Sequence, residues 1–416
     1  MSIRPATAGC IAAAALVAAG TSPALATPSY DLLTTIAIPA DSANPNPGGA
    51  FTSFDISYFD PTTRLDYVAD RSNASVDVFS GTGLTLVGRA TGFTGQQATT
   101  SVSGPDGVVA VSNGAQHTLF AGDGNSTLKS FNLATSPTSP PTQFAPINTG
   151  GKFRVDEMAY SPLTNQVLAA NNADAPAFAT LVNASTGAIE HGNIVIPGAA
   201  PGDGLEQPVW NPNTKSFFVS VPQFAGTGAG GVAEINTDGT VGRLYNFADF
   251  GIASCSPTGL TVGGSGNLLV GCGNAGTQTV LLNPAGTGSI VKTFTQISGS
   301  DELYYDPNLR DFYVTGVDTA LNSRAFDVIS DMSNSILDTV ALPNVNAHSI
   351  AVDPGNGNVF VPLPGGAANT VCSAGCMAVY GAATQVPEPA SLAILATGLV
   401  GLAGFGKRRR NSPKAK

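Results

Sequence analysis

Short apolar segments alternate with turn residues along most of the chain. One pattern, an apolar strand that ends in a proline turn, recurs at 55–61, 156–162, 206–212, 301–307 and 348–354. A second apolar segment follows each turn, at 65–69, 166–170, 216–220, 311–315 and 358–362. Apolar and polar positions alternate with a period of two in these segments, which predicts half-buried β-strands.

Two further copies of the pattern carry glycines around the turn. They are Gly104-Pro105-Asp106-Gly107 and Gly263-Gly264-Ser265-Gly266, and we interpret both as turns between a first and a second strand. The copies are spaced by about 44 to 52 residues, the size of one propeller blade. Third strands are predicted at 75–79, 127–131, 178–182, 231–235, 278–282, 325–329 and 377–380, and fourth strands at 189–196, 290–297 and 336–342. Four strands per copy predict an all-β, seven-bladed β-propeller.

The two ends of the repeat array indicate a closed ring. The seventh copy reaches its third strand at 377–380 and then runs into a different kind of sequence, so its fourth strand is missing. A lone strand is predicted at 31–38, ahead of the first copy. Pairing of that strand with the last blade closes the ring and removes the exposed sheet edges. We therefore expect one propeller domain at 27–385, without a helix longer than two turns.

Two segments carry a family resemblance. Tyr67-Val-Ala-Asp-Arg-Ser-Asn73 and Phe312-Tyr-Val-Thr315 resemble the YVTN-type repeats of surface-layer-like β-propellers, and the body as a whole resembles secreted bacterial propellers of that group. The resemblance implies the fold but no single activity, because one fold carries many functions. Function therefore has to be argued from the residues of a site.

Residues 1–26 have the features of a secretory signal peptide. Arg4 supplies the positive charge, 11–19 is a short apolar stretch, and Ala24-Leu25-Ala26 is a cleavage site of small residues. We therefore expect export and a mature chain that begins near Thr27.

The segment 386–416 is a tail of three parts. It contains Val386-Pro387-Glu388-Pro389, an apolar stretch at 390–405 and the basic run Lys407-Arg408-Arg409-Arg410. We interpret the apolar stretch as a short transmembrane helix, although a spanning helix typically needs about 20 residues, and its basic end is expected to stay cytoplasmic. This arrangement closely resembles a PEP-CTERM sorting signal. The resemblance implies a Gram-negative cell envelope, surface or matrix location, often with exopolysaccharide production, and tail processing by an exosortase, a membrane cysteine protease. The tail before processing is the only expected membrane contact.

Net charge distinguishes the body from the ends. The whole chain has 18 Lys and Arg residues against 28 Asp and Glu, a formal charge of −10. Without the two terminal segments, 11 basic and 27 acidic residues remain, a charge of about −16. An acidic body is suited to cations or neutral glycans and argues against nucleic acid as a partner.

Charged residues recur at one position of the repeat. The first strand starts with Asp55, Asp156, Glu206, Asp301 or His348, and the next position adds Glu157 and Glu302. In a propeller the first strand of each blade lines the central channel, so these side chains are expected at its mouth. Converging carboxylates with a histidine are suited to Ca²⁺ or another hard cation, or to general acid–base catalysis. A structural interpretation also stays open, because acids at strand starts accept backbone hydrogen bonds or persist as copies of a repeat.

Four cysteines remain after removal of the signal peptide: Cys255, Cys272, Cys372 and Cys376. Export to an oxidising compartment favours disulfides, and three pairings are possible. Cys255 starts a first strand and Cys272 ends the second strand of the same hairpin, so these two should face each other, whereas the other two are close enough to join within one loop. We expect the pairs 255–272 and 372–376.

The sequence contains no evident nucleophile, zinc or phosphate-binding motif. Gly263–Gly266 does not fit the G-x-S-x-G pattern, and the three histidines have no metal-binding spacing. The leading hypothesis is a non-enzymatic surface or matrix propeller that binds a glycan or a protein and needs no cofactor. The alternative is a metal-dependent hydrolase of lactonase type that uses the carboxylate-lined channel, although the sequence lacks an evident Asn pair beside the carboxylates.

Overall fold

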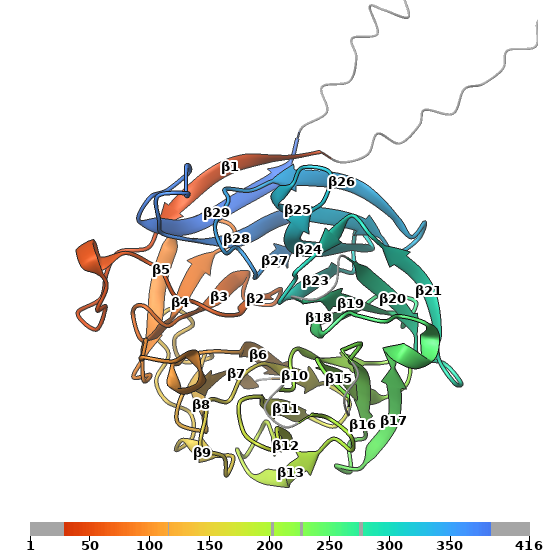
Figure 1. Ribbon diagram of the computed structural model, residues 1–416. Helices are drawn as coiled ribbons and strands as arrows, with labels where there is room; N and C mark the ends of the chain where they lie inside the picture. The colour runs from red at the N-terminus through yellow and green to blue at the C-terminus, as the bar shows by residue number, and fades with distance from the viewer. Residues whose placement is uncertain (1–28, 115, 201–203, 225–227, 274–277, 384–416) are drawn as a thin grey trace, which may run out of the picture. The chain divides into compact units, whose positions relative to one another are not determined.

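The computed structural model describes residues 29–114, 116–200, 204–224, 228–273 and 278–383. In this part of the chain, seven antiparallel sheets are arranged around a common axis (Figure 1). The helical segments are single 3-10 turns: η1 Pro47–Gly49, η2 Thr100–Val102 and η3 Phe247–Phe250. The prediction of an all-β, seven-bladed propeller is confirmed.

The first four blades each contain four strands, ordered from the axis outward. Blade 1 consists of β2 Ser57–Asp60, β3 Leu65–Asp70, β4 Ser75–Ser80 and β5 Leu86–Thr91. Blade 2 consists of β6 Val108–Asn113, β7 Gln116–Asp123, β8 Thr127–Asn132 and β9 Ile147–Asn148. Blade 3 consists of β10 Met158–Ser161, β11 Gln166–Asn171, β12 Phe178–Asn183 and β13 Ile189–Val195. Blade 4 consists of β14 Pro208–Asn211, β15 Ser216–Val221, β16 Gly231–Ile235 and β17 Val241–Asn246.

The last three blades complete the ring. Blade 5 consists of β18 Pro257–Val262, β19 Leu268–Cys272, β20 Thr279–Asn283 and β21 Ser289–Phe294. Blade 6 consists of β22 Ile297–Ser298 and β23 Leu303–Asp306, which both pair with β24 Asp311–Asp318, followed by β25 Ser323–Ser330 and β26 Ser335–Ala341. Blade 7 consists of β27 Ala351–Asp353, β28 Asn358–Pro364, β29 Gly375–Ala382 and β1 Tyr30–Ala37.

The ring closes as the sequence predicts. β1 is the outermost strand of blade 7 and pairs antiparallel with β29, from Tyr30 opposite Ala382 to Ala37 opposite Cys376. The first and last described strands thus share one sheet, which removes the open edge that each would otherwise present.

The repeated proline turn has a common local cause. The carboxylate of Asp60 accepts a hydrogen bond from the N–H of Thr62 at 2.9 Å, and Asp306 accepts one from Asn308 at 2.7 Å. Asp at the first turn position and Pro at the second favour a tight turn, because Pro fixes its φ near the value the turn needs. Each innermost strand is therefore followed closely by its partner in the same blade.

One turn prediction is wrong. Residues 104–107 do not connect the first two strands of blade 2 but precede β6, and the connection lies between β6 and β7. The backbone of Gly107 packs against blade 3, where a Cβ atom would collide with the carbonyl oxygen of Asp156. The glycine therefore permits a close approach of two blades, a role that looks the same as a turn in the local sequence.

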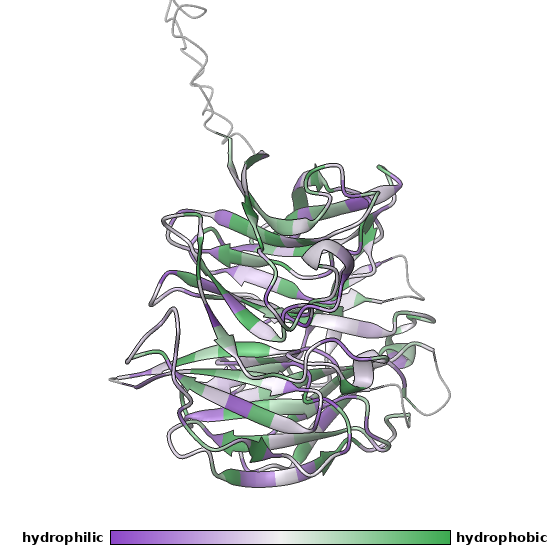
Figure 2. Ribbon diagram, turned by 90° about the vertical axis from the view of Figure 1, so that its left-hand side faces the viewer, coloured by the Kyte–Doolittle hydropathy of each residue, from purple (hydrophilic) through white to green (hydrophobic). Residues whose placement is uncertain are grey.

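Hydrophobic residues pack between neighbouring blades. Among the described residues, seven buried clusters occupy the seven blade interfaces. In one of them Trp210 and Phe217 of blade 4 pack with Leu168 of blade 3, and another joins Phe59 of blade 1 to Phe360 of blade 7. Figure 2 shows hydrophobic residues along the strands. Burial of each such side chain contributes about 1.5–3 kcal/mol, so the ring is stabilised at every interface.

Both expected disulfides are present. Cys255–Cys272 joins the segment before β18 to the end of β19, and Cys372–Cys376 closes a short loop at the start of β29. The predicted signal peptide and the predicted helix at 390–405 lie outside the described residues. No helix in the described residues has the length and apolar character needed to cross a membrane.

Candidate functional site

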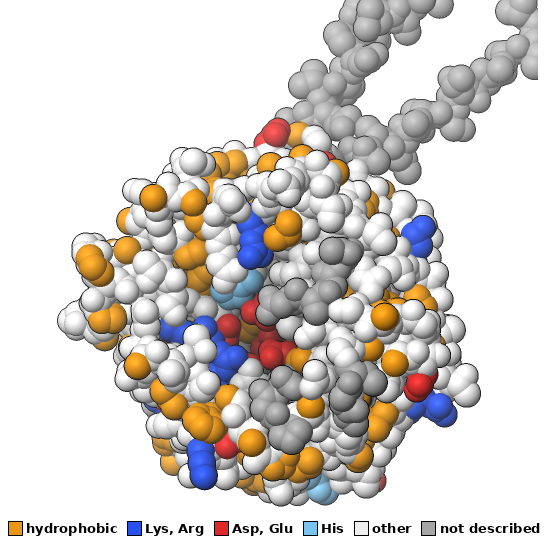
Figure 3. All heavy atoms as spheres, viewed as in Figure 1, with side chains coloured by type: hydrophobic (Ala, Val, Ile, Leu, Met, Phe, Trp, Pro, Cys, Tyr) orange, Lys and Arg blue, Asp and Glu red, His pale blue; other side chains and the backbone are white. Residues whose placement is uncertain are grey.

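Charged side chains gather where the innermost strands begin. Figure 3 shows acidic side chains at the centre of one face, flanked by basic side chains and a histidine. Asp55, Asp156, Glu206, Asp301 and His348 each lie two or three residues before an innermost strand. We call the following set the channel mouth: Asp55, Asp106, Asp156, Glu157, Glu206, Asp301 and His348, with Arg71 and Arg154.

Arg71 connects the first two blades at the channel mouth. It follows β3, its side chain is only 6% exposed, and its Nη2 lies 2.5 Å from a carboxylate oxygen of both Asp55 and Asp106. Its Nη1 donates to the backbone oxygen of Phe54 at 3.0 Å. A planar guanidinium with several donors suits this position, because it can serve three acceptors at fixed angles.

Arg154 extends this network to blades 3 and 4. Its guanidinium lies 2.9 Å from Asp156 and 3.5 Å from Asp106. Its Nε donates to the side-chain oxygen of Asn172 at 3.1 Å, and Asn172 is hydrogen-bonded to Glu206. The two arginines thus fix the acids of the first three blades and, through an amide, orient that of the fourth.

The arginines do not fully offset burial of the acids. Burial raises the pKa of Asp55, but the charges of Arg71 and Arg154 outweigh it and hold that pKa below its usual value. For Asp106 burial prevails over the same two arginines, and its pKa rises to about 7. Burial also raises the pKa of Asp156 well above its usual value. The channel mouth therefore holds two carboxyl groups, those of Asp106 and Asp156, whose pKa values lie above the usual range.

A second group of acids lies away from these ion pairs. A carboxylate oxygen from each of Glu157, Glu206 and Asp301 lies within 4.8 Å of the others. Burial, followed by the charge of Asp301, raises the pKa of Glu206 to about 7. The arrangement offers oxygen ligands from three different blades.

His348 lies between the two groups of acids. Its Nε2 is 3.9 Å from Asp55 and 4.0 Å from Asp301, while its Nδ1 is 2.9 Å from the backbone oxygen of Asn346. Its ring stacks on Phe54, with centroids 4.3 Å apart. These contacts hold the imidazole in one orientation at the channel mouth.

Glu302 is separate from the channel mouth. Its Oε2 accepts hydrogen bonds from the Ser349 hydroxyl, from the N–H of Ser57 at 3.1 Å and from the N–H of Ile350 at 3.3 Å. These donors come from blades 1 and 7, so Glu302 connects three blades. Its contacts are those of a structural residue.

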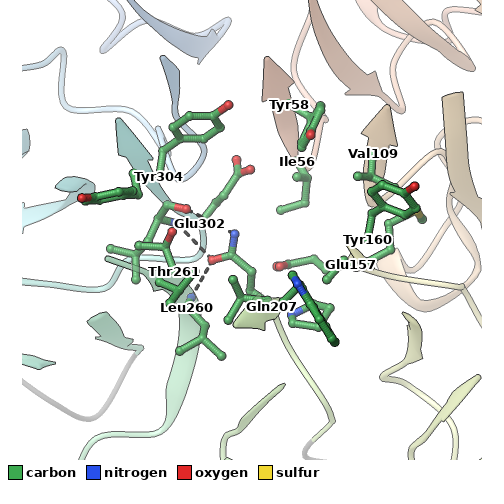
Figure 4. A pocket seen from close by; sticks show the side chains of 18 of the residues that line it. Ile56, Tyr58, Val109, Glu157, Tyr160, Gln207, Leu260, Thr261, Glu302 and Tyr304 are labelled. Atoms are coloured by element: carbon green, nitrogen blue, oxygen red, sulfur yellow. Dashed lines mark hydrogen bonds between the residues drawn. The ribbon is translucent and has the colours of Figure 1, made fainter. Parts of the chain in front are cut away.

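Beyond the acids, the channel continues as a cavity of about 350 Å³ (Figure 4). Its lining is largely aromatic and aliphatic, and includes Tyr58, Tyr160, Trp210 and Tyr304. The side chain of Gln207 spans neighbouring blades, since its Oε1 accepts from the N–H groups of Leu260 at 2.5 Å and Leu303 at 3.1 Å. The cavity thus combines an aromatic and aliphatic lining with the polar side chains of Glu157, Gln207 and Glu302.

A polar pocket of about 500 Å³ adjoins the channel mouth between blades 5, 6 and 7. Asp301 and His348 of the channel mouth line it, together with Arg324 and Asn346. Arg324 donates to the side-chain oxygen of Asn346 at 3.1 Å, and burial lowers the pKa of Arg324. The pocket presents donors and acceptors on several sides.

Three of the channel-mouth residues, Asp106, Arg71 and Arg154, were not identified from the sequence. Asp106 lies 51 residues after Asp55 and 50 before Asp156, so the repeat spacing could have located it. Arg71 and Arg154 occupy no repeated position, and only the folded ring brings them to the acids.

Comparison with known proteins identifies the tail. The model of the PEP-CTERM protein-sorting motif matches residues 385–410, which include Val386–Pro389 and Lys407–Arg410. The chain carries a PEP-CTERM sorting signal. A PEP-CTERM signal is recognised by an exosortase and marks an exported protein of the cell envelope. The propeller is therefore the exported part of an exosortase-processed protein.

Solved structures share only the fold. Raptor from Chaetomium thermophilum matches with a TM-score of 0.58 and 14% identity over 86% of this chain, which spans 29% of the Raptor chain. The WD40 β-propeller domain of Doa1 matches with a TM-score of 0.57 and 14% identity over 86% of this chain and 98% of that one. No curated protein matches the sequence. These similarities carry no argument about a ligand.

Proposed function

We propose that the mature protein is a non-enzymatic binding protein of the cell surface or extracellular matrix, and that its partner binds at the channel mouth and the adjoining polar pocket. The main observation that supports this proposal is the convergence of charged groups from several blades on one face, in a chain with only 11% charged residues. The PEP-CTERM signal supports a location at the envelope. The resemblance to YVTN-type surface propellers agrees with that location.

The chemistry of the pocket favours a neutral glycan as the ligand. Asp301, Asn346, Arg324 and His348 supply both hydrogen-bond donors and acceptors, which hydroxyl-rich ligands require. The acidic body repels polyanions. A glycan of the envelope or of an exopolysaccharide therefore fits this pocket better than a nucleic acid or an anionic polymer.

The ion pairs favour binding over hydrolysis. A lactonase-like mechanism needs carboxylates that are free to hold a metal or move a proton. Three of the channel-mouth acids, Asp55, Asp106 and Asp156, are engaged by two arginines, so such a mechanism would have to rely on Glu157, Glu206 and Asp301 alone. Lactone and ester hydrolysis by the purified protein, measured with and without divalent cations, tests the alternative, and turnover would support the hydrolase.

Binding is tested with the exported protein and with envelope glycan and exopolysaccharide from the producing cells. Arg324→Ala and Asn346→Ala each remove polar contacts from the pocket, so each is expected to weaken binding about tenfold. Arg310→Ala is the matched control, because Arg310 lies at the other end of the innermost strand, in the turn after β23. Equal binding by all variants would contradict the proposed site, and binding that protease treatment of the partner removes would identify a protein ligand instead.

The tail is tested separately by deleting residues from Val386 onward. Loss of the sorting signal is expected to move the protein out of its normal envelope or surface fraction, as measured by fractionation and immunoblotting. A deletion that leaves the distribution unchanged would contradict the assigned role of the signal.

A further inference from the structure

Two buried glutamates occupy the same place in the repeat but have different surroundings. Asp156-Glu157 and Asp301-Glu302 both precede an innermost strand, and Glu157 and Glu302 are each 3% exposed. Glu302 has three hydrogen-bond donors around one oxygen. The Oε2 of Glu157 has no hydrogen-bond partner among the described residues. A buried carboxylate oxygen without a partner is unfavourable, so this position calls for a group that the described residues do not supply.

The carboxylate of Glu157 is directed toward other acids. Figure 4 shows this side chain reaching from blade 3 toward the channel axis. One of its oxygens lies within 4.8 Å of an oxygen of Glu206 from blade 4 and of Asp301 from blade 6. Three carboxylates that approach each other this closely repel one another unless a cation or protons lie between them.

The other group of acids at the channel mouth is paired with two arginines. Asp55, Asp106 and Asp156 also place ligand atoms within 4.8 Å of one another, but Arg71 and Arg154 contact all three at 2.5–2.9 Å. No Lys or Arg forms an ion pair with Glu157, Glu206 or Asp301 within the described segments. The imidazole Nε2 of His348 lies 4.0 Å from Asp301. Two guanidinium groups thus neutralise the first group of acids, whereas the described part of the chain places no Lys or Arg in an ion pair with the second.

We propose that Glu157, Glu206 and Asp301 bind one Ca²⁺ ion at the channel mouth and thereby join blades 3, 4 and 6. This site goes beyond the proposed function, because Ca²⁺ binding by these three acids does not require the glycan or any other partner. The three ligands are all carboxylate oxygens, which argues against Zn²⁺, because that ion favours nitrogen and sulfur ligands.

The arrangement and exposure of the three acids favour Ca²⁺ over Mg²⁺. Ca²⁺ accepts oxygen ligands at about 2.3–2.6 Å in variable geometry, which suits carboxylates contributed by three different blades, whereas Mg²⁺ at about 2.0–2.1 Å requires near-ideal octahedral geometry. The side chain of Asp301 is 35% exposed, which leaves room for water ligands to complete the coordination shell. Extracellular Ca²⁺ modules bind with dissociation constants of about 10⁻⁴–10⁻³ M, and a site of three carboxylates and water belongs in that range.

The test is calorimetric titration with CaCl₂ and thermal unfolding, using full-length exported protein first treated with EDTA. The wild-type protein is expected to bind one Ca²⁺ and to unfold at a higher temperature when the ion is present. Glu157→Gln keeps the size of the side chain but removes its charge, so the affinity is expected to fall at least about tenfold, and the thermal shift is expected to disappear. Glu302→Gln is the matched control, at the equivalent repeat position and burial, and should retain Ca²⁺ binding.

Several results would overturn the site. They are absence of Ca²⁺ binding by the wild-type protein, unchanged affinity in Glu157→Gln, loss of binding in both glutamate variants alike, or tighter binding of Mg²⁺ than of Ca²⁺. If Glu157→Gln does not fold, Asp301→Asn replaces it, because Asp301 is partly exposed and its variant should fold. Unchanged Ca²⁺ affinity in that variant would reject the proposal, and a tenfold loss would support it.

Discussion

Arg71 is the residue whose removal should most disturb the channel mouth. Its guanidinium contacts Asp55 and Asp106 at 2.5 Å and the backbone oxygen of Phe54 at 3.0 Å. Arg71→Met retains much of the apolar volume but removes the charge and every donor. Two buried carboxylates from different blades then lose their closest cation.

The expected loss of stability follows from this burial. Removing one partner of a buried ion pair costs about 3–5 kcal/mol, because an uncompensated charge is left in the interior. Arg154 remains 3.5 Å from Asp106 and 3.9 Å from Asp55, so it compensates in part and places the expected loss near the lower figure. Arg310→Met is the matched control, since Arg310 is 47% exposed and lies 3.7 Å from Asp331, and an exposed pair contributes less than about 1 kcal/mol.

The loss in Arg71→Met should depend on pH with a defined sign. Without Arg71 the folded-state pKa values of Asp55 and Asp106 rise. A carboxyl with a raised folded pKa gives up stability as the pH rises through that pKa, so the variant should lose more stability at pH 8 than at pH 5. Urea unfolding followed by circular dichroism measures both values. A loss below about 1 kcal/mol at pH 8, or an equal loss at both pH values, would refute the reasoning.

Two further predictions concern the body of the propeller. Replacing Cys255 and Cys272 with Ala opens a loop with a sequence separation of 17 and should lower the free energy of unfolding by denaturant by about 3 kcal/mol. Replacing Cys372 and Cys376, with a separation of 4, should lower it by less. Equal losses would contradict the loop-entropy argument. Burial raises the pKa values of Asp66 and Asp327 to about 7, so these carboxyls stabilise the folded state at low pH and lose that contribution as the pH rises from about 4 through 7. The melting temperature should therefore be higher at pH 5 than at pH 8. The variant Asp66→Asn should show a smaller difference between the two pH values.

Much of the fold was predictable because each repeat is defined by residues that are close together in the sequence. Asp-Pro turns, alternating strands and the lone strand that became β1 each depend on short segments, and ring closure followed from a missing strand. The segment 104–107 misled because Gly-Pro-Asp-Gly has the composition of a turn. Its actual constraint is the approach of Gly107 to Asp156 in another blade.

The site was less predictable because its partners are distant in the sequence. The acids could be located from their repeated position, but Arg71 reaches Asp106 across 35 residues, and Arg154 has no counterpart in the other blades. The difference between Glu157 and Glu302 depends on Ser349, which blade 7 contributes. No local pattern distinguishes a glutamate that meets such a donor from one that does not.

Hydrogen–deuterium exchange tests most directly whether the channel mouth is the binding face. The exported protein is compared with and without envelope glycan from the producing cells. Our account predicts slower exchange in the segments before β23 and β27, which carry Asp301 and His348, and no change in outer strands such as β13. Protection confined to the outer strands, or to the turns at the opposite end of the innermost strands, would contradict it.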